Sequence, residues 1–60
     1  SNYFTAPCFV YILKCNDGSY YVGHTINLKK RLKAHRQGED CEYTAPRRPV
    51  VLVFVKRFET

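Results

Sequence analysis

The sequence predicts a small α/β domain in which two strands, one helix and a third strand follow one another along the chain. Three observations support this prediction. Two β-prone runs flank an Asn-Asp-Gly turn, residues 27–37 have helical periodicity, and residues 50–55 form an unbroken apolar run. A chain of 60 residues buries only about 60% of the surface that its unfolded form exposes. We therefore expect a single domain over residues 1–60, and neither a barrel nor a Rossmann fold.

The first two strands are predicted at residues 9–13 and 20–22, joined as a hairpin. Two loops are compatible with the turn between them. A two-residue Asp-Gly loop places Tyr11 and Tyr21 on opposite faces of the sheet. A three-residue loop, with Gly18 in the left-handed conformation, places both tyrosines on one face. Local rules leave both registers open.

The periodicity next predicts a helix over residues 27–37. Asn27 or Thr25 can serve as its N-cap, and Gly38 is suited to the position just past its C-terminus. Leucines four residues apart form the apolar stripe of this helix. Its lysines fall on the opposite side, which we expect to face solvent.

A loop at residues 39–49 and a third strand at residues 50–55 complete the chain. The loop is long for so small a domain, and long loops are often functional. The apolar run is typical of a strand covered on both faces. One helix covers only one face of a three-stranded sheet. We therefore expect a further covering element beyond Thr60 or from a partner, with self-association through the uncovered face as one outcome.

The net charge and the cysteines indicate which partners and which cellular compartment suit this chain. Ten Lys and Arg against five Asp and Glu give a net charge of +5, which favours a polyanionic partner such as DNA or RNA. No apolar run is long enough to span a membrane. Three cysteines without a Cys-x-x-Cys pair argue against a disulfide framework and a zinc site. This usage fits a reducing, cytoplasmic compartment.

Five side chains are expected near the junction of sheet and helix: Tyr11, Tyr21, His24, Arg31 and His35. On a helical wheel, Arg31 and His35 border the apolar stripe one turn apart. An arginine side chain can donate two parallel hydrogen bonds to the oxygens of a phosphate. A phenol or an imidazole can accept a proton from water. Each residue also has a purely structural interpretation, such as a core tyrosine or a loop histidine. These five residues include no carboxylate, and the acidic residues of the loop are not spaced like the ligands of a metal ion.

The motifs resemble a known family. Phe9-Val10-Tyr11, followed ten residues later by Tyr21-Val22-Gly23, resembles the paired signature of the GIY-YIG nuclease superfamily. Further matches follow in order: His24-Thr25, Leu28, Arg31-Leu32, His35, Gly38, Tyr43-Thr44, Arg47-Arg48-Pro49, Val50, Leu52 and Phe58. They are similar to the small bacterial single-domain members related to the excision-repair nuclease UvrC. Phe9 departs from the glycine of the first motif, and many members carry Lys or Ser where this chain has His24.

The resemblance implies metal-dependent hydrolysis of phosphodiester bonds in DNA. One of Tyr11 and Tyr21 would act as general base, and Arg31 would hold the scissile phosphate. Both tyrosines must then share one face, which selects the three-residue hairpin loop. A glutamate on a helix after the third strand would bind Mg²⁺ or Mn²⁺. Its position lies beyond Thr60, so the resemblance implies a domain truncated at its C-terminus, with the third strand paired to the first, that cuts DNA poorly by itself.

We expect His24 and His35 to take part in the catalytic site. A phenol with a pKa near 10 needs cationic neighbours to act as a base, and Lys14, His24 and Arg31 are available. The predicted contacts to the nucleic-acid backbone are Lys29, Lys30, Arg47 and Arg48. The alternative function is a non-catalytic basic module that binds nucleic acid without a metal. The residues do not decide between DNA and RNA, or which tyrosine is the base.

Overall fold

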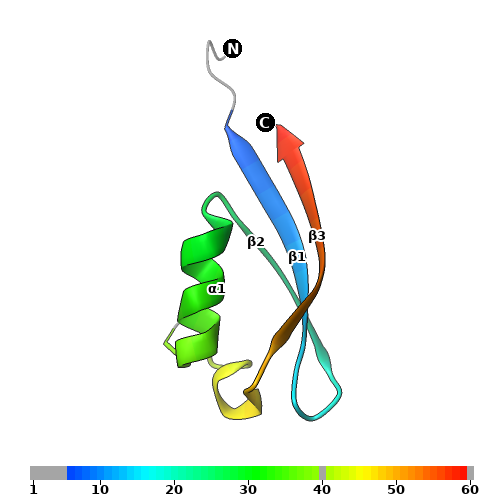
Figure 1. The fold of residues 1–60 in the computed structure, drawn as a ribbon, viewed down its shortest axis with the longest axis vertical. Helices are drawn as coiled ribbons and strands as arrows, with labels where there is room; N and C mark the ends of the chain where they lie inside the picture. The colour runs from blue at the N-terminus through cyan, green and yellow to red at the C-terminus, as the bar shows by residue number, and fades with distance from the viewer. Residues whose placement is uncertain (1–5, 40, 60) are drawn as a thin grey trace.

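The computed structural model describes residues 6–39 and 41–59. Its elements are β1 (Pro7–Lys14), β2 (Tyr20–Thr25), α1 (Leu28–Gln37), the short 3₁₀ helix η1 (Ala45–Arg47) and β3 (Val51–Glu59). The three strands form one antiparallel sheet in the order β2-β1-β3, with β1 in the centre (Figure 1). The predicted α/β class, the element order and the pairing of the third strand with the first are confirmed.

The hairpin between β1 and β2 has the three-residue loop. The Cys15 amide donates to the Ser19 carbonyl at 2.8 Å, and Gly18 has a φ of 88°. Only glycine adopts that left-handed conformation without strain, which is why the turn forms here. The resulting register places Tyr11 opposite Gly23 and puts the two tyrosines of the pair on the same face.

Helix α1 begins and ends where the sequence indicated. The Asn27 side chain is the N-cap and accepts a hydrogen bond from the Lys30 amide at 3.1 Å. Thr25, the other candidate, instead accepts from the Asn27 amide at 3.1 Å and so fixes the entry into the helix. Gly38 ends the helix with a φ of 74°.

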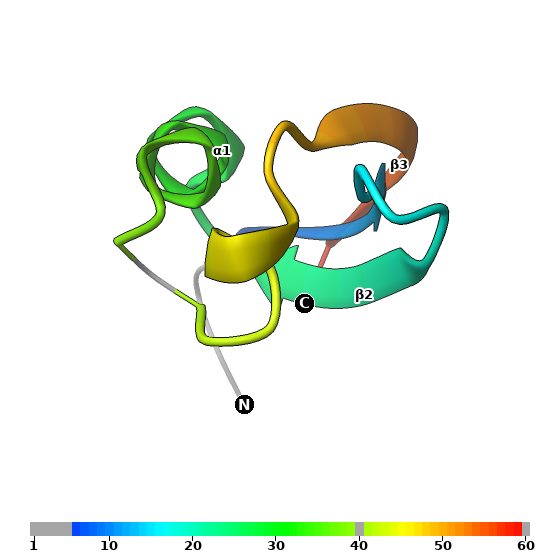
Figure 2. The same ribbon diagram turned by 90° about the horizontal axis from the view of Figure 1, so that it is seen from below.

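The core lies on one face of the sheet, here called the inner face, which carries Tyr11, Leu13 and Cys15. These side chains are 0%, 1% and 4% exposed. Helix α1 and η1 both lie on one side of the sheet (Figure 2). The fully buried side chain that α1 contributes is His35 rather than a leucine. The centre of this small core is therefore polar, and its polar atoms must be hydrogen-bonded.

Strand β3 differs from the prediction in two ways. It extends to Glu59, because its last residues keep pairing with the start of β1, and edge strands tolerate charged residues such as Lys56. It also contains a bulge opposite Ile12 and Leu13. As expected for a sheet with one helix, one face of the strand is uncovered within the described residues, where Phe54 and Phe58 are 48% and 42% exposed.

The opposite side of the sheet is here called the open face; β2 contributes Tyr20, Val22 and His24 to it, and β3 contributes Phe54 and Phe58. Its large apolar side chains are accessible to solvent. Within residues 6–39 and 41–59, no helix is long and apolar enough to cross a membrane.

Candidate active site

The two tyrosines of the paired motif meet on the inner face. The ring centroids of Tyr11 and Tyr21 lie 6.5 Å apart, with the planes tilted by 44°. Tyr11 is fully buried, whereas Tyr21 is half-buried. A Cβ atom at Gly23 would overlap the Tyr11 hydroxyl, so glycine in the second motif leaves the space that this phenol occupies.

A buried hydrogen-bonded chain runs from Tyr11 into the helix and the loop. The Tyr11 hydroxyl lies 2.8 Å from His35 Nε2, and His35 Nδ1 lies 2.8 Å from the Thr44 hydroxyl. All three side chains are 0% exposed. The sequence predicted that Tyr11 and His35 belong to one site, and in the structure a hydrogen bond connects the two side chains.

The Tyr21 hydroxyl has a different partner. It forms a hydrogen bond to the Cys41 sulfur, which together with burial raises the pKa of Tyr21 above its ordinary value of 10.0, while the Arg31 charge acts weakly in the opposite direction. Burial works to raise the pKa of the Cys41 thiol. Hydrogen bonds from the backbone amides of Thr44 and Tyr43, and from the Thr44 and Tyr21 hydroxyls, outweigh it and lower that pKa below 9.0. The two tyrosines thus have chemically different neighbours.

An aromatic stack closes the site on the loop side. The Tyr43 ring stacks on Tyr21 at 6.1 Å with an interplanar angle of 23°, and the Arg47 guanidinium lies 3.9 Å from the centre of the Tyr43 ring. Arg47 also pairs with Asp17 at 3.0 Å and donates to the Tyr43 carbonyl at 2.7 Å. These contacts hold the loop against the hairpin.

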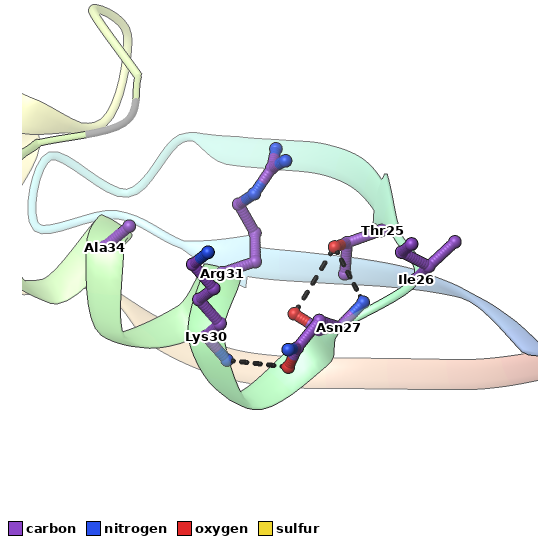
Figure 3. Close-up of a pocket in the computed structure, with 6 residues that line it drawn as sticks. All are labelled: Thr25, Ile26, Asn27, Lys30, Arg31 and Ala34. Atoms are coloured by element: carbon purple, nitrogen blue, oxygen red, sulfur yellow. Dashed lines mark hydrogen bonds between the residues drawn. The ribbon is translucent and has the colours of Figure 1, made fainter.

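A pocket of about 440 Å³ lies between the end of β2 and α1. Its lining residues are Thr25, Ile26, Asn27, Lys30, Arg31 and Ala34. In Figure 3 the Arg31 guanidinium extends from α1 toward β2. Two cations beside a helix N-terminus without acidic residues in its first turn form a surface suited to a phosphate group.

The remaining predicted site residues lie elsewhere. His24 pairs with Val10, so it belongs to the open face and the structure does not bring it to the tyrosine pair. Lys29 is exposed on α1. Arg47 has the intramolecular contacts described above, and Arg48 donates to the Ala45 carbonyl at 2.8 Å while its guanidinium packs against Gly38. Both arginines therefore help to shape the loop.

The described residues contain no group of three or more His, Cys, Asp and Glu that could hold a metal ion. Of the loop acids, Glu39 and Glu42 are exposed and Asp40 lies outside the described residues. A divalent cation prefers several oxygen ligands, and this part of the chain does not supply that set. The described residues therefore do not form a binding site for a divalent metal ion by themselves.

Sequence reasoning missed the roles of Cys41, Tyr43 and Thr44. Tyr43-Thr44 belongs to the quoted motif pattern, but the pattern assigns neither residue a partner. The usable signal was the length of loop 39–49, which carries all three side chains to the inner face. Their partners, His35 and Tyr21, cannot be read from spacing alone because the contacts are tertiary.

Fold and site together define the class of a small nuclease-type α/β domain, with paired tyrosines facing the arginine and histidine of one helix. The sequence profile of the GIY-YIG catalytic domain matches residues 7–60, and the chain belongs to this family. Family membership supports a nuclease-type function, and nucleases of this family generally use divalent metals.

Similar curated proteins include several that are named UPF0213 proteins. One from Bacillus velezensis (RBAM_000440) is 52% identical over 52 residues, covering 87% of this chain and 52% of the relative. One from Clostridium perfringens (CPE1444) is 55% identical over 51 residues, covering 85% and 55%. The solution NMR structure of the UPF0213 protein BH0048 from Bacillus halodurans has a TM-score of 0.50 and 42% identity, covering 87% of this chain and 55% of that one. The chain spans about half the length of these relatives.

Proposed function

We propose that this protein is a metal-dependent endonuclease that hydrolyses phosphodiester bonds in DNA. The observation that supports this most is the buried hydrogen bond between Tyr11 and His35, together with a pocket lined by Arg31 on the same helix as His35. A phenol is a weak base at neutral pH, because its unperturbed pKa is near 10. A hydrogen-bonded imidazole that can take up its proton removes this obstacle.

In this proposal Arg31 grips the non-bridging oxygens of the scissile phosphate. Arginine suits this task because its planar guanidinium donates two parallel hydrogen bonds. Arg31 lines this pocket one helical turn before His35 on α1, and its charge also acts on Tyr21. We therefore expect a phosphate held by Arg31 to be near the tyrosine pair. Because the Tyr11 side chain is buried, substrate binding has to open access to its hydroxyl. Tyr11 then takes a proton from the attacking water, and His35 takes the proton of Tyr11.

The metal is the part of the proposal that the described residues do not supply. Membership of the family leads us to include Mg²⁺ or Mn²⁺, held by ligands outside residues 6–39 and 41–59. Such an ion would neutralise charge on the phosphate and the leaving oxygen.

The DNA partner is supported by the net charge of +5. We expect contacts to the DNA backbone mainly from Lys29, Lys30 and Arg31, because the two lysines are exposed on α1 and Arg31 lines the pocket beside them. Each phosphate contact should add about 0.9 to the slope of log affinity against log salt. Replacing Lys29 with Ala should lower that slope by about this amount and leave sequence preference unchanged.

The test is cleavage of plasmid and short duplex DNA by the full-length protein, with and without Mg²⁺ or Mn²⁺. Tyr11→Phe and Arg31→Ala should each lower the rate by about 100-fold or more. Tyr20→Phe is the matched control, because Tyr20 lies on the open face and is 58% exposed. A non-catalytic binding module, the alternative favoured by the lack of a metal cluster in the described part of the chain, would bind DNA with the same salt dependence and never cut it.

Self-association through the open face is a second property we propose. Val22 and Phe54 are 62% and 48% exposed on this face, and exposed apolar surface of this kind favours contact with other protein surfaces. Sedimentation should detect association of the 60-residue chain that the substitution of Phe54 with Ser weakens.

A further inference from the structure

The loop after α1 presents an aromatic ring and a guanidinium together at the surface. The guanidinium carbon of Arg47 lies 3.9 Å from the centre of the Tyr43 ring. Tyr43 is 37% exposed and the Arg47 side chain is 33% exposed, so a ligand can reach this pair from solvent. No step of the proposed hydrolysis uses the exposed part of the pair.

Hydrogen bonds fix the plane of the Arg47 guanidinium. Its Nε donates to one carboxylate oxygen of Asp17 at 3.0 Å, and one of its terminal nitrogens donates to the Tyr43 carbonyl at 2.7 Å. The Ser19 amide donates to the other carboxylate oxygen of Asp17 at 2.9 Å and so holds that side chain in turn. Because these groups are already ordered, a ligand that stacks on the guanidinium loses little affinity to the ordering of Arg47.

The main chain anchors Arg47 as well. The Arg47 amide donates to the Thr44 carbonyl at 2.9 Å, and the Asn16 amide donates to the Arg47 carbonyl at 2.8 Å. Asn16 and Asp17 belong to the same hairpin loop, so this loop holds both the main chain and the side chain of Arg47. The pair of Tyr43 and Arg47 is therefore an ordered surface.

These contacts also determine which kind of ligand suits the pair. The carboxylate of Asp17 compensates the charge of Arg47, so this arginine attracts a phosphate group less than an unpaired cation does. Its planar shape is unaffected, and a guanidinium has two faces of which only one can contact Tyr43. Aromatic rings and guanidinium planes are the groups on which unpaired nucleobases stack. The pair therefore suits a base better than a phosphate.

One ring connects this pair with the candidate active site. The Tyr43 ring stacks on Tyr21 at 6.1 Å, and the Tyr21 ring lies 5.3 Å from His35 and 6.5 Å from Tyr11. In the proposed function a phosphate lies near the tyrosine pair. A nucleotide a short distance along the same strand then comes beside Tyr43 and Arg47.

We propose that Tyr43 and Arg47 form a binding site for one unpaired nucleobase of the DNA strand. This inference deepens the proposed function and rests on it for DNA as the ligand. A base inside an intact duplex is stacked between its neighbours and has no free face. The site therefore favours DNA with an unpaired nucleotide, as in a single strand or at a junction of single-stranded and double-stranded segments, over an intact duplex.

The experiment measures binding of the full-length protein to a short fluorescent single strand and to the duplex of the same sequence, with EDTA present so that metal-dependent cleavage does not occur. Tyr43→Leu removes the ring and should weaken binding of the single strand about tenfold, while duplex affinity changes by less than about twofold. Tyr43→Phe keeps the ring and should bind like the unmodified protein. Tyr20→Leu is the matched control, because Tyr20 is an exposed tyrosine on the open face. Equal losses in Tyr43→Leu and Tyr20→Leu would overturn the proposal.

Arg47→Lys separates stacking from charge. Lysine keeps the positive charge but has no planar group, so affinity for the single strand should fall about fivefold while the slope of log affinity against log salt stays the same. A loss of the same size for single strand and duplex would indicate a phosphate contact or a general disturbance of the loop, and would overturn the proposal.

NMR spectra of the unmodified protein with ¹³C-labelled tyrosine rings need no variant and decide the question even if Tyr43→Leu does not fold. A stacked base changes the ring current at its partner, so the single strand should shift the ring signals of Tyr43 and leave those of Tyr20 unchanged. The duplex should shift neither ring to the same extent. Tyr43 signals that the single strand does not move would overturn the proposal.

These binding measurements are independent of cleavage. A protein that binds single strands through Tyr43 and cuts no DNA would contradict the nuclease function and still support the base-binding site. A protein that cuts DNA, but whose Tyr43→Leu variant binds single strands normally, would do the reverse. The two ideas can therefore fail separately.

Discussion

The two faces of the same three strands are built in opposite ways. The inner face buries Tyr11 and Leu13 under α1 and η1 and connects its polar atoms by hydrogen bonds. The open face presents Val22 and Phe54 to solvent. In a small domain one expects apolar residues to be the more deeply buried set. Here a phenol, an imidazole and a hydroxyl occupy the deepest positions, which indicates that the inner face is constrained by chemistry as well as by packing.

The largest expected effect on stability comes from the apolar core. Leu13→Ala on the inner face should lower the free energy of unfolding by about 2–5 kcal/mol, because it leaves a cavity in a site that is 1% exposed. Phe54→Ala on the open face should cost about 1 kcal/mol, since much of that ring already contacts water. Urea unfolding measures the loss of stability in each of the two variants. Equal costs would contradict the distinction between the faces.

A smaller effect is expected at the glycine of the second motif. Gly23→Ala places a methyl group where the Tyr11 hydroxyl lies, so it should displace that phenol from His35 and cost about 1–3 kcal/mol. Gly18→Ala is the matched control. Alanine at a φ of 88° should also cost about 1 kcal/mol of stability. A methyl group at Gly18 meets no neighbouring atom, however, and the position is in the hairpin loop, away from the site. Cleavage should fall only in Gly23→Ala. A fall of the same size in Gly18→Ala would mean that general destabilisation explains both.

The smallest effect concerns the thiol beside Tyr21. Because its hydrogen-bond donors lower the pKa of Cys41 below 9.0, alkylation of Cys41 should reach half its maximal rate below that pH. Tyr21→Phe removes one donor and should move the midpoint upward, whereas Tyr20→Phe should not. Iodoacetamide labelling followed by peptide mass spectrometry separates Cys41 from the other cysteines. A midpoint that Tyr21→Phe leaves unmoved would contradict the hydrogen bond.

The fold was predictable because its signals are local. The Asn-Asp-Gly turn, the Asn27 cap and the Gly38 terminus each act within a few residues, and they indicate the hairpin and the helix. Local rules left two hairpin registers open, and the shared face of the tyrosines was predicted from the family resemblance. The end of β3 was missed because its pairing with β1 is decided by a partner strand more than forty residues away. Charged residues at that end also weakened the apolar pattern on which the prediction relied.

The candidate site was predictable only as a set of residue types. Tyr11, Arg31 and His35 were identified from the motifs, but His24 was placed with them although the register puts it on the open face. The contacts of Thr44 with His35, and of Cys41 with Tyr21, come from the way the loop folds back. No periodicity describes such a loop, so its contribution to the site required the structure.

The central claim is that Tyr11, hydrogen-bonded to His35, is the general base of a DNA-cutting site. The most direct measurement compares single-turnover cleavage of duplex DNA by the full-length Tyr11→Phe and Tyr21→Phe variants at saturating protein and metal. We predict that Tyr11→Phe loses about 100-fold or more of the rate, and that Tyr21→Phe, which removes only the hydrogen bond to Cys41, loses about tenfold or less. A Tyr11→Phe variant that cuts at the unmodified rate while Tyr21→Phe is inactive would contradict this account.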